Sequence, residues 1–167
     1  GISTHLKIDF KYSSASKFAE KQAVLFKDKA RLAGVDVNLI PLEFTVLIQD
    51  TKKRDYEMYS SAWGQDPTVD DPKQLWHSES DTPSGGNRVS FINAKADSLI
   101  DAIRVTLDEQ QRQELYLEFQ ELIYEEQPYI FLFSPFQRIA ISKGFKAEAS
   151  ARRPGFFVNE FVSADVA

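Results

Sequence analysis

The alternation of strand-like and helix-like patterns over the first sixty residues constrains the fold of this chain more than any other feature. Apolar and polar side chains alternate with period two over residues 6–12, which predicts a half-buried strand. From Ser16 onward the period becomes helical, and Phe18, Leu25 and Leu32 recur on one face, with Phe26, Ala30 and Ala33 beside them. Such an apolar stripe normally faces a protein core, so we expect it to be buried.

A second strand, a shorter helix and a third strand continue this alternation. Residues 35–40 predict a strand that ends at Pro41, and residues 44–54 predict a helix. Residues 56–63 predict the third strand. A strand–helix–strand–helix–strand order predicts an α/β fold with a mainly parallel sheet flanked by helices.

The rest of the chain adds one long loop, two helices and further strands. Residues 64–92 are rich in proline, aspartate and glycine and predict a long functional loop. Asn93 and Asp108 are suited to cap two amphipathic helices, and Pro128 ends the second. The continuous apolar run 129–133 predicts a strand covered on both faces, and residues 137–142 and 156–162 predict later strands.

Composition limits the classes of function. The 167 residues suit a single domain, 1–167, and 43% hydrophobic residues are enough for a packed core. Twenty basic and twenty-five acidic residues give a net charge of −5, which argues against a nucleic-acid partner. The chain has no cysteine, which excludes disulfides, thiol nucleophiles and cysteine–zinc sites. Its apolar runs are too short to span a membrane.

The end of the third predicted strand is the most informative candidate site. Trp63, Gly64, Gln65 and Asp66 follow small residues and precede Pro67. Ligands of open parallel sheets bind beyond the carboxyl ends of the strands, where a carboxylate can pair with a cation. The alternative is that Trp63 belongs to the core and Asp66 only opens a turn before Pro67.

Other polar clusters give little support for catalysis. The acidic residues 66, 70 and 71 lack the ligand spacing of a calcium loop, and no second histidine lies near His77. Ser78 beside His77 matches no catalytic triad, and Gly85-Gly86 lacks a phosphate-binding pattern. We therefore expect no cofactor, no metal and no enzymatic activity.

An ordered set of motifs nevertheless resembles a known family. The set comprises Ala62-Trp63-Gly64-Gln65-Asp66-Pro67, then Asp71-Pro72-Lys73-Gln74-Leu75-Trp76-His77-Ser78, Asn87 ahead of Phe91, and Glu126-Gln127-Pro128-Tyr129-Ile130-Phe131-Leu132-Phe133. From about residue 6 to about residue 157, the chain resembles the C-terminal lobe of family 5 extracellular solute-binding proteins. These are the dipeptide- and oligopeptide-binding components of bacterial ABC importers.

The resemblance implies a fold and a binding mode. Members have two lobes around a cleft that closes over an extended ligand, so this chain would be one lobe of a type II periplasmic-binding-protein architecture. The resemblance places Asp66 where peptide binders hold the α-ammonium group of the peptide. The implied ligand-binding residues are Asp66, Trp63, Gly64, Gln65, Trp76 and Asn87. Trp63 and Trp76 could line the cleft or belong to the core of the lobe.

The resemblance also implies partners and a location. We expect a short peptide ligand, the N-terminal lobe of the same precursor and an ABC permease in the membrane. The location would be periplasmic or extracellular, with any membrane anchor in a segment outside this chain. An apolar face normally covered by the other lobe would be exposed in isolation. Alternatives are an oligosaccharide or metal complex as ligand or, in a different class, a small α/β hydrolase.

Overall fold

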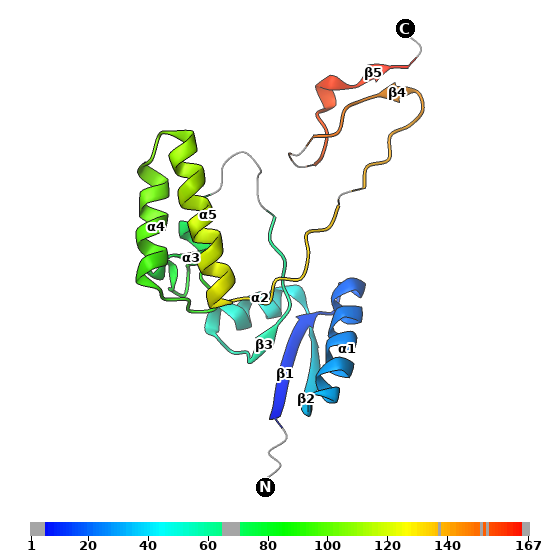
Figure 1. The fold of residues 1–167 in the computed structure, drawn as a ribbon. Coiled ribbons are helices and arrows are strands. Elements are labelled where there is room, and N and C mark those ends of the chain that lie inside the picture. Colours follow the sequence, from blue (N-terminus) through cyan, green and yellow to red (C-terminus); the bar gives the residue numbers. More distant parts are fainter. Residues whose placement is uncertain (1–5, 65–70, 137, 151, 153, 165–167) are drawn as a thin grey trace.

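A computed structural model describes residues 6–64, 71–136, 138–150, 152 and 154–164. Its main sheet contains β1 (Leu6–Ser13), β2 (Val35–Leu42) and β3 (Met58–Tyr59) in the order β2-β1-β3 (Figure 1). Both pairings are parallel, with Phe10 of β1 aligned with Leu39 on one side and Met58 on the other. The predicted parallel α/β arrangement is confirmed.

Helices α1 (Lys17–Leu32) and α2 (Phe44–Lys53) cover opposite faces of the sheet. Phe10 and Tyr12 of β1 point to one face, where they form a core with Ala19 and Ala23 of α1. Lys11 points to the other face because side chains alternate along a strand, and there its Nζ lies 2.9 Å from Asp50 Oδ2 of α2.

The buried face of α1 differs from the predicted one. Ala19 and Ala23 are buried, whereas Phe18, Leu25 and Leu32 are 57%, 59% and 76% exposed. The expected burial is therefore wrong for these three residues, whereas Phe26 and Ala30 of the same predicted stripe do pack against the sheet core. Small side chains at 19 and 23 let the helix lie close to the strands, and Phe18, Leu25 and Leu32 remain exposed.

The second and third strands differ from prediction in length. β2 continues through Pro41, which an edge strand tolerates because one side of its backbone needs no hydrogen-bonded partner. β3 contains only Met58 and Tyr59, and Ser60 N adds one bond to Lys11 O at 3.0 Å. Trp63 therefore lies beyond the paired part of β3 and not inside it.

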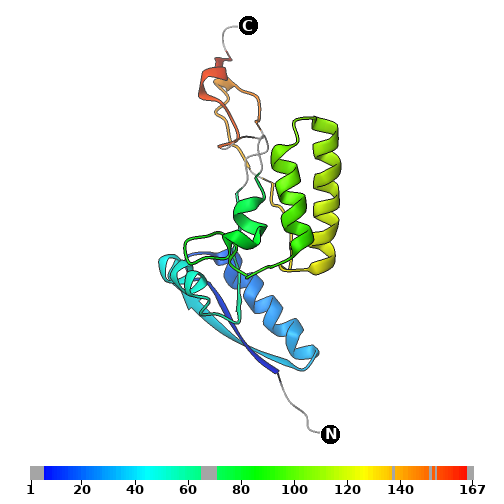
Figure 2. The same cartoon turned by 90° about the vertical axis from the view of Figure 1, so that its left-hand side faces the viewer.

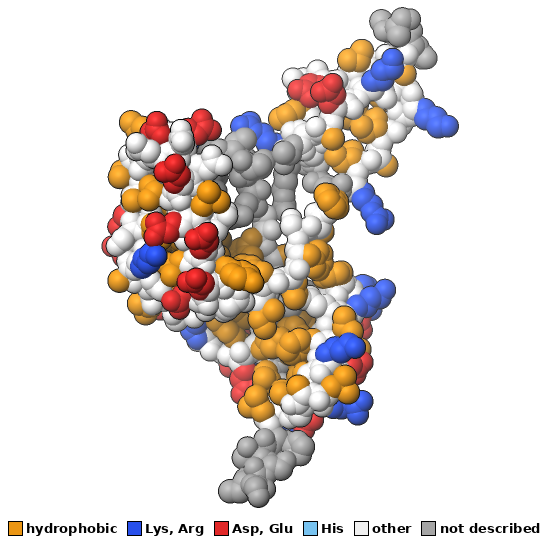
Figure 3. All heavy atoms as spheres, viewed as in Figure 1, with side chains coloured by type: hydrophobic (Ala, Val, Ile, Leu, Met, Phe, Trp, Pro, Cys, Tyr) orange, Lys and Arg blue, Asp and Glu red, His pale blue; other side chains and the backbone are white. Residues whose placement is uncertain are grey.

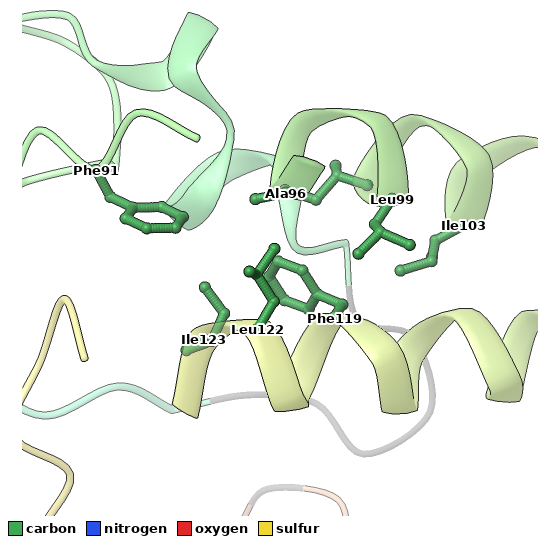
Figure 4. Packing of buried hydrophobic residues seen from close by; sticks show 8 residues of the cluster. Phe91, Ala96, Leu99, Ile103, Phe119, Leu122 and Ile123 are labelled. Atoms are coloured by element: carbon green, nitrogen blue, oxygen red, sulfur yellow. The ribbon is translucent and has the colours of Figure 1, made fainter. Parts of the chain in front are cut away.

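The two predicted helices form a hairpin with its own core (Figure 4). Helix α4 (Ala94–Val105) begins after the Asn93 cap, and α5 (Glu109–Glu126) begins after the Asp108 cap. Both caps accept backbone N–H groups, as predicted. The interface is formed by buried apolar residues: Phe91, Ala96, Leu99, Ile100, Ile103, Phe119, Leu122 and Ile123.

The long segment between β3 and α4 is more structured than predicted. It contains the short helix α3 (Lys73–Trp76) and the 3-10 turn η1 (Ser78–Ser80). Helix α3 contacts α4, so this segment joins the hairpin to the sheet unit (Figure 2).

The chain after α5 departs most from the predictions. Residues 129–133 form no strand, and Ile130, Phe131, Leu132 and Phe133 are all at least 51% exposed. Instead of strands at 137–142 and 156–162, the described residues form a small antiparallel pair, β4 (Phe145–Lys146) and β5 (Val162–Ser163), preceded by the 3-10 turn η2 (Val158–Glu160). We call the described residues 138–150 and 154–164 the C-terminal arm. It extends away from the sheet and the hairpin (Figure 1). Within the described ranges, no helix is both long and apolar enough to cross a bilayer.

Candidate functional site

The candidate site lies where the chain leaves the carboxyl end of β3. The Ser60 hydroxyl donates to Gln22 Oε1 of α1 at 3.2 Å, which ties this end of the strand to the helix. Ser61, Ala62, Trp63 and Gly64 then become exposed. Trp63 is 43% exposed, so much of its indole ring remains accessible at the end of the sheet where ligands of such folds bind.

Tyr129 lies between the two tryptophans that the sequence singled out. Its ring is perpendicular to that of Trp63 at a centroid distance of 4.7 Å, and nearly perpendicular to that of Trp76 at 5.2 Å. Phe131 contacts both Tyr129 and Trp76 at 6.2 Å. These spacings and angles are those that aromatic pairs favour. We call Trp63, Trp76, Tyr129 and Phe131 the aromatic junction.

The segment after Tyr129 continues along the same end of the sheet. Phe133 packs edge-on against Phe18 at the start of α1, with ring centroids 5.2 Å apart. Residues 129–133 therefore run from the end of β3 to the start of α1. Their apolar side chains line this end of the sheet without forming a strand.

Burial changes the acidity of the phenols next to the aromatic junction. It raises the pKa of Tyr59 to about 12, and the neighbouring phenol of Tyr56 adds to the effect. Burial also raises the pKa of Tyr129, with further contributions from Tyr59 and Tyr56. Both phenols are neutral at physiological pH, so they contribute apolar rings and neutral hydroxyl groups to this region.

Trp76 packs against the hairpin core and also against Tyr129. It lies half-buried against the hairpin core, in edge-to-face contact with Phe91 and Phe119 at 6.3 Å each. One aromatic side chain thus contacts both the core of the hairpin and Tyr129. Its role in ligand binding stays a prediction.

His77 is buried at the start of η1. Its Nδ1 accepts the backbone N–H of Glu79 at 3.1 Å and lies 3.7 Å from Asp97 Oδ1. Its Nε2 has no hydrogen-bond partner in the described part of the chain, and Asp101 Oδ1 lies 3.7 Å away. The Asp97 carboxylate also accepts the backbone N–H and the hydroxyl of Ser78, so this cluster anchors η1 on α4.

Asn87 is fully buried, and its amide group bonds to the backbone. Its Nδ2 donates to Phe91 O at 2.7 Å and to His77 O at 3.3 Å, while Oδ1 accepts Phe91 N–H at 3.0 Å. These bonds hold the loop against the start of the hairpin. The predicted contact between Asn87 and ligand stays a prediction.

The remaining site residues are placed only in part. Gly64 is exposed at the end of the described segment. Gln65 and Asp66 lie outside the described residues, so their predicted roles stay predictions. Among the described residues, no three histidine or acidic side chains come together as they would to hold a metal ion.

A polar network that the sequence did not reveal joins the end of α2 to the loop that precedes α4. Arg54 is the C-cap of α2, and its Nη2 donates to Asp81 Oδ1 and to Asn87 O. Its Nε donates to Ser90 Oγ at 3.2 Å, and Ser90 donates to Asp81 Oδ1 at 3.1 Å. Arg54 and Ser90 both have left-handed backbones, with φ of 59° and 53°. We call Arg54, Asp81, Asn87 and Ser90 the Arg54 clamp.

Neither the Arg54 clamp nor Tyr129 could be recognised from local sequence. Arg54 lies in the basic last turn of a predicted helix, where a side chain exposed to solvent is the ordinary outcome. Tyr129 lies in an apolar run that predicts a strand. Only the approach of segments distant in sequence gives each residue its contacts.

Comparison with curated proteins identifies relatives of one kind, although no family model matches the sequence. The oligopeptide-binding protein AppA of Bacillus subtilis is 26% identical over 81% of this chain. A probable D,D-dipeptide-binding periplasmic protein, DdpA of Escherichia coli, is 25% identical over 83%, and di/tripeptide-binding protein 2 of Pseudomonas aeruginosa is 29% identical over 68%. The chain is homologous to peptide-binding proteins. The resemblance inferred from the sequence is confirmed, and these relatives are binding proteins by name.

Solved structures agree on the fold. The chain matches the structure of B. subtilis AppA in complex with a nonapeptide over 95% of its length, with a TM-score of 0.81 and 23% identity. It also matches the ABC transporter substrate-binding protein CtaP of Listeria monocytogenes over 70% of its length, with a TM-score of 0.61 and 30% identity. The chain spans about a quarter of the length of its curated relatives: 25%, 27% and 21% of the three proteins named above.

Proposed function

We propose that this chain is a ligand-binding lobe, C-terminal in a longer protein, of a solute-binding component that delivers short peptides to an ABC importer. The observation that carries the proposal is the homology to three proteins that are each named for binding peptides. In this proposal the chain is a single domain, 1–167, and the N-terminal lobe of the same precursor supplies the other side of the cleft. It is a binding module and not an enzyme, and it acts in the periplasm or outside the cell beside a membrane permease.

The local chemistry of the site supports a peptide as ligand. Trp63 is partly exposed at the carboxyl end of the sheet, and Asp66 follows it by three residues in sequence. A carboxylate that becomes enclosed needs a cationic partner, and a free α-ammonium group offers three donors. We therefore assign Asp66 to the amine of the peptide and Trp63 to the chain that follows it, with Gly64, Gln65, Trp76 and Asn87 as further candidates.

Closure of a cleft would couple binding to a change of shape. A ligand that contacts both lobes stabilises the closed state by its difference in affinity for the closed and open states. Hydrogen bonds to the peptide backbone give affinity without strong selectivity for side chains. This combination suits a receptor that accepts peptides of many sequences.

Calorimetric titration of mixed short peptides into the full-length protein that contains this chain tests the proposal. Wild-type protein should bind, and Asp66→Asn should weaken binding by about tenfold or more, because a buried ammonium group would lose its ionic partner. Asp28→Asn, which changes an exposed carboxylate on α1, is the matched control and should leave affinity unchanged.

Two other results would redirect the assignment. Binding of peptides that is indifferent to Asp66→Asn would remove the amine-binding role of this residue. If no peptide binds, oligosaccharides and metal complexes become the ligands to titrate. Hydrolysis of a peptide or ester by the wild-type protein would contradict the proposal that the chain is only a binding module.

A further inference from the structure

We propose that Tyr129 is a positioning residue of the ligand site, which it serves by holding the indole of Trp63 in a fixed orientation against Trp76. This inference rests on the proposed peptide-binding function and assigns a role that neither the sequence nor the comparisons suggested. Its basis is the geometry of the aromatic junction.

Tyr129 gives the Trp63 ring a specific, perpendicular contact. In the described part of the chain, Tyr129 is the only aromatic residue in ring contact with Trp63. Ser61, Ala62 and Gly64 beside it are exposed, so they provide little packing. A partly exposed tryptophan on such a segment samples several rotamers unless a neighbour selects one.

Tyr129 is itself held firmly enough to select that rotamer. Its ring packs on Trp76, which is fixed in the hairpin core by Phe91 and Phe119. Its hydroxyl oxygen is buried. Pro128 and the end of α5 restrict the backbone just before it. Trp63 is thereby connected to the hairpin core through two ring contacts, Trp76 with Tyr129 and Tyr129 with Trp63.

The junction therefore links two units that have separate cores. One core lies between β1, β2 and α1, and the other lies between α4 and α5. Trp63 extends from the sheet unit, whereas Trp76 belongs to the hairpin core. The Arg54 clamp joins the same two units by polar contacts that do not involve Trp63, which provides a control for general loosening of the structure.

The test uses four variants of the full-length protein that contains this chain: Tyr129→Leu, Tyr129→Phe, Trp63→Leu and Arg54→Ala. Peptide affinity, near-ultraviolet circular dichroism and the thermal midpoint are measured for each. Tyr129→Leu should weaken peptide binding by about 3- to 10-fold, the factor that one or two aromatic pairs contribute. Tyr129→Phe keeps the ring and should stay within about 2-fold of wild type. If Tyr129→Leu does not fold, Tyr129→Met replaces it with the same expectation, since methionine fills irregular apolar space.

Two readouts separate positioning from mere stability. Tyr129→Leu should reduce the near-ultraviolet signal of the tryptophans, whereas Arg54→Ala should lower the thermal midpoint and leave that signal unchanged. In a double-mutant cycle, Tyr129→Leu should have little further effect on affinity once Trp63 is already leucine, because it acts through that ring.

The two proposals fail in different ways. If the wild type binds no peptide, the proposed function is wrong, and the circular dichroism still reports whether Tyr129 orients Trp63. If the wild type binds peptide and the effects of Tyr129→Leu and Trp63→Leu simply add, the positioning role is wrong. The same conclusion follows if Tyr129→Leu lowers the thermal midpoint but leaves the near-ultraviolet signal of the tryptophans unchanged.

Discussion

At the scale of single residues, Arg54 and Tyr59 show how buried polar groups are accommodated in this chain. The guanidinium of Arg54 donates to one carboxylate, to one hydroxyl and to two backbone carbonyls. One carbonyl belongs to Thr51 in α2 and the other to Asn87 in the loop before α4. Arg54 and Asp81 are only 28% and 21% exposed, so solvent screens their attraction less than it would at the surface. Their energetic contribution should therefore exceed that of an ordinary surface ion pair.

Arg54→Ala should lower the free energy of unfolding by about 2 kcal/mol, because Asp81 and Asn87 O lose a charged donor while partly buried. Urea unfolding of the two proteins measures the difference. Lys52→Ala, an exposed basic residue in the same helix, is the control and should change stability by less than about 0.5 kcal/mol. Equal stabilities of Arg54→Ala and wild type would show that the clamp contributes nothing.

Because burial raises the pKa of Tyr59, we expect the chain to lose stability at alkaline pH. Its pKa is about 12 in the folded chain and about 10 when unfolded, so between these values the folded state keeps a proton that the unfolded state has lost. Its stabilising contribution is complete below pH 10 and disappears as the pH rises to about 12. With partial exposure taken into account, the loss should be about 1–2 kcal/mol.

Thermal unfolding from pH 8 upward, compared with Tyr59→Phe, checks this expectation. The variant cannot ionise at this position, so its stability should fall less steeply above pH 10. Parallel curves for the two proteins would show that the Tyr59 phenol titrates alike in the folded and unfolded chain.

At the scale of elements, the α4–α5 hairpin is the part of the chain most completely determined by local sequence. Its four buried α4 residues, Ala96, Leu99, Ile100 and Ile103, recur at helical spacing. Asn93 caps the helix by accepting two backbone N–H groups. The hairpin core is separate from that of the sheet, so its stability depends mainly on its own packing.

Ile100→Ala should destabilise the chain by about 3 kcal/mol, because it removes a fully buried side chain and leaves a cavity between the helices. Leu107→Ala is the matched control, since Leu107 lies between α4 and α5 and is 93% exposed. Chemical denaturation of both variants distinguishes them. A cost for Ile100→Ala as small as that for Leu107→Ala would mean that the hairpin core is not packed as described.

At the scale of the whole molecule, the most prominent feature is exposed apolar surface. Phe18, Leu25 and Leu32 lie on the outer side of α1, and residues 130–133 add a second apolar region. In the view of Figure 3, hydrophobic side chains are visible on the sheet unit and on the C-terminal arm. Apolar surface of this extent usually marks an interface.

In isolation, this chain should therefore self-associate. Sedimentation velocity should show a weight-average mass above 19.0 kDa that rises with protein concentration. Leu25→Glu, on the exposed face of α1, should reduce association without lowering the thermal midpoint. A monomer at all concentrations would show that this apolar surface does not drive association.

The sequence by itself determined the elements that depend on neighbouring residues. The period-two pattern of β1, the caps Asn93 and Asp108 and the apolar spacing of α4 and α5 all act within a few residues, so they could be recognised without a structure. The family resemblance likewise followed from ordered local motifs. Asp66, the residue on which the peptide hypothesis most depends, was also found in this way, and its role stays a prediction.

Only the tertiary structure decided how these elements meet. It buried Ala19 and Ala23 and packed Phe26 against the same core, while Phe18 stayed exposed, because the position of the helix on the sheet decides which part of an apolar stripe is covered. It left residues 129–133 without strand pairing, since a strand requires a backbone partner from a distant segment. It placed Tyr129 between two tryptophans for the same reason: contacts between residues far apart in sequence leave no periodic signal along the chain.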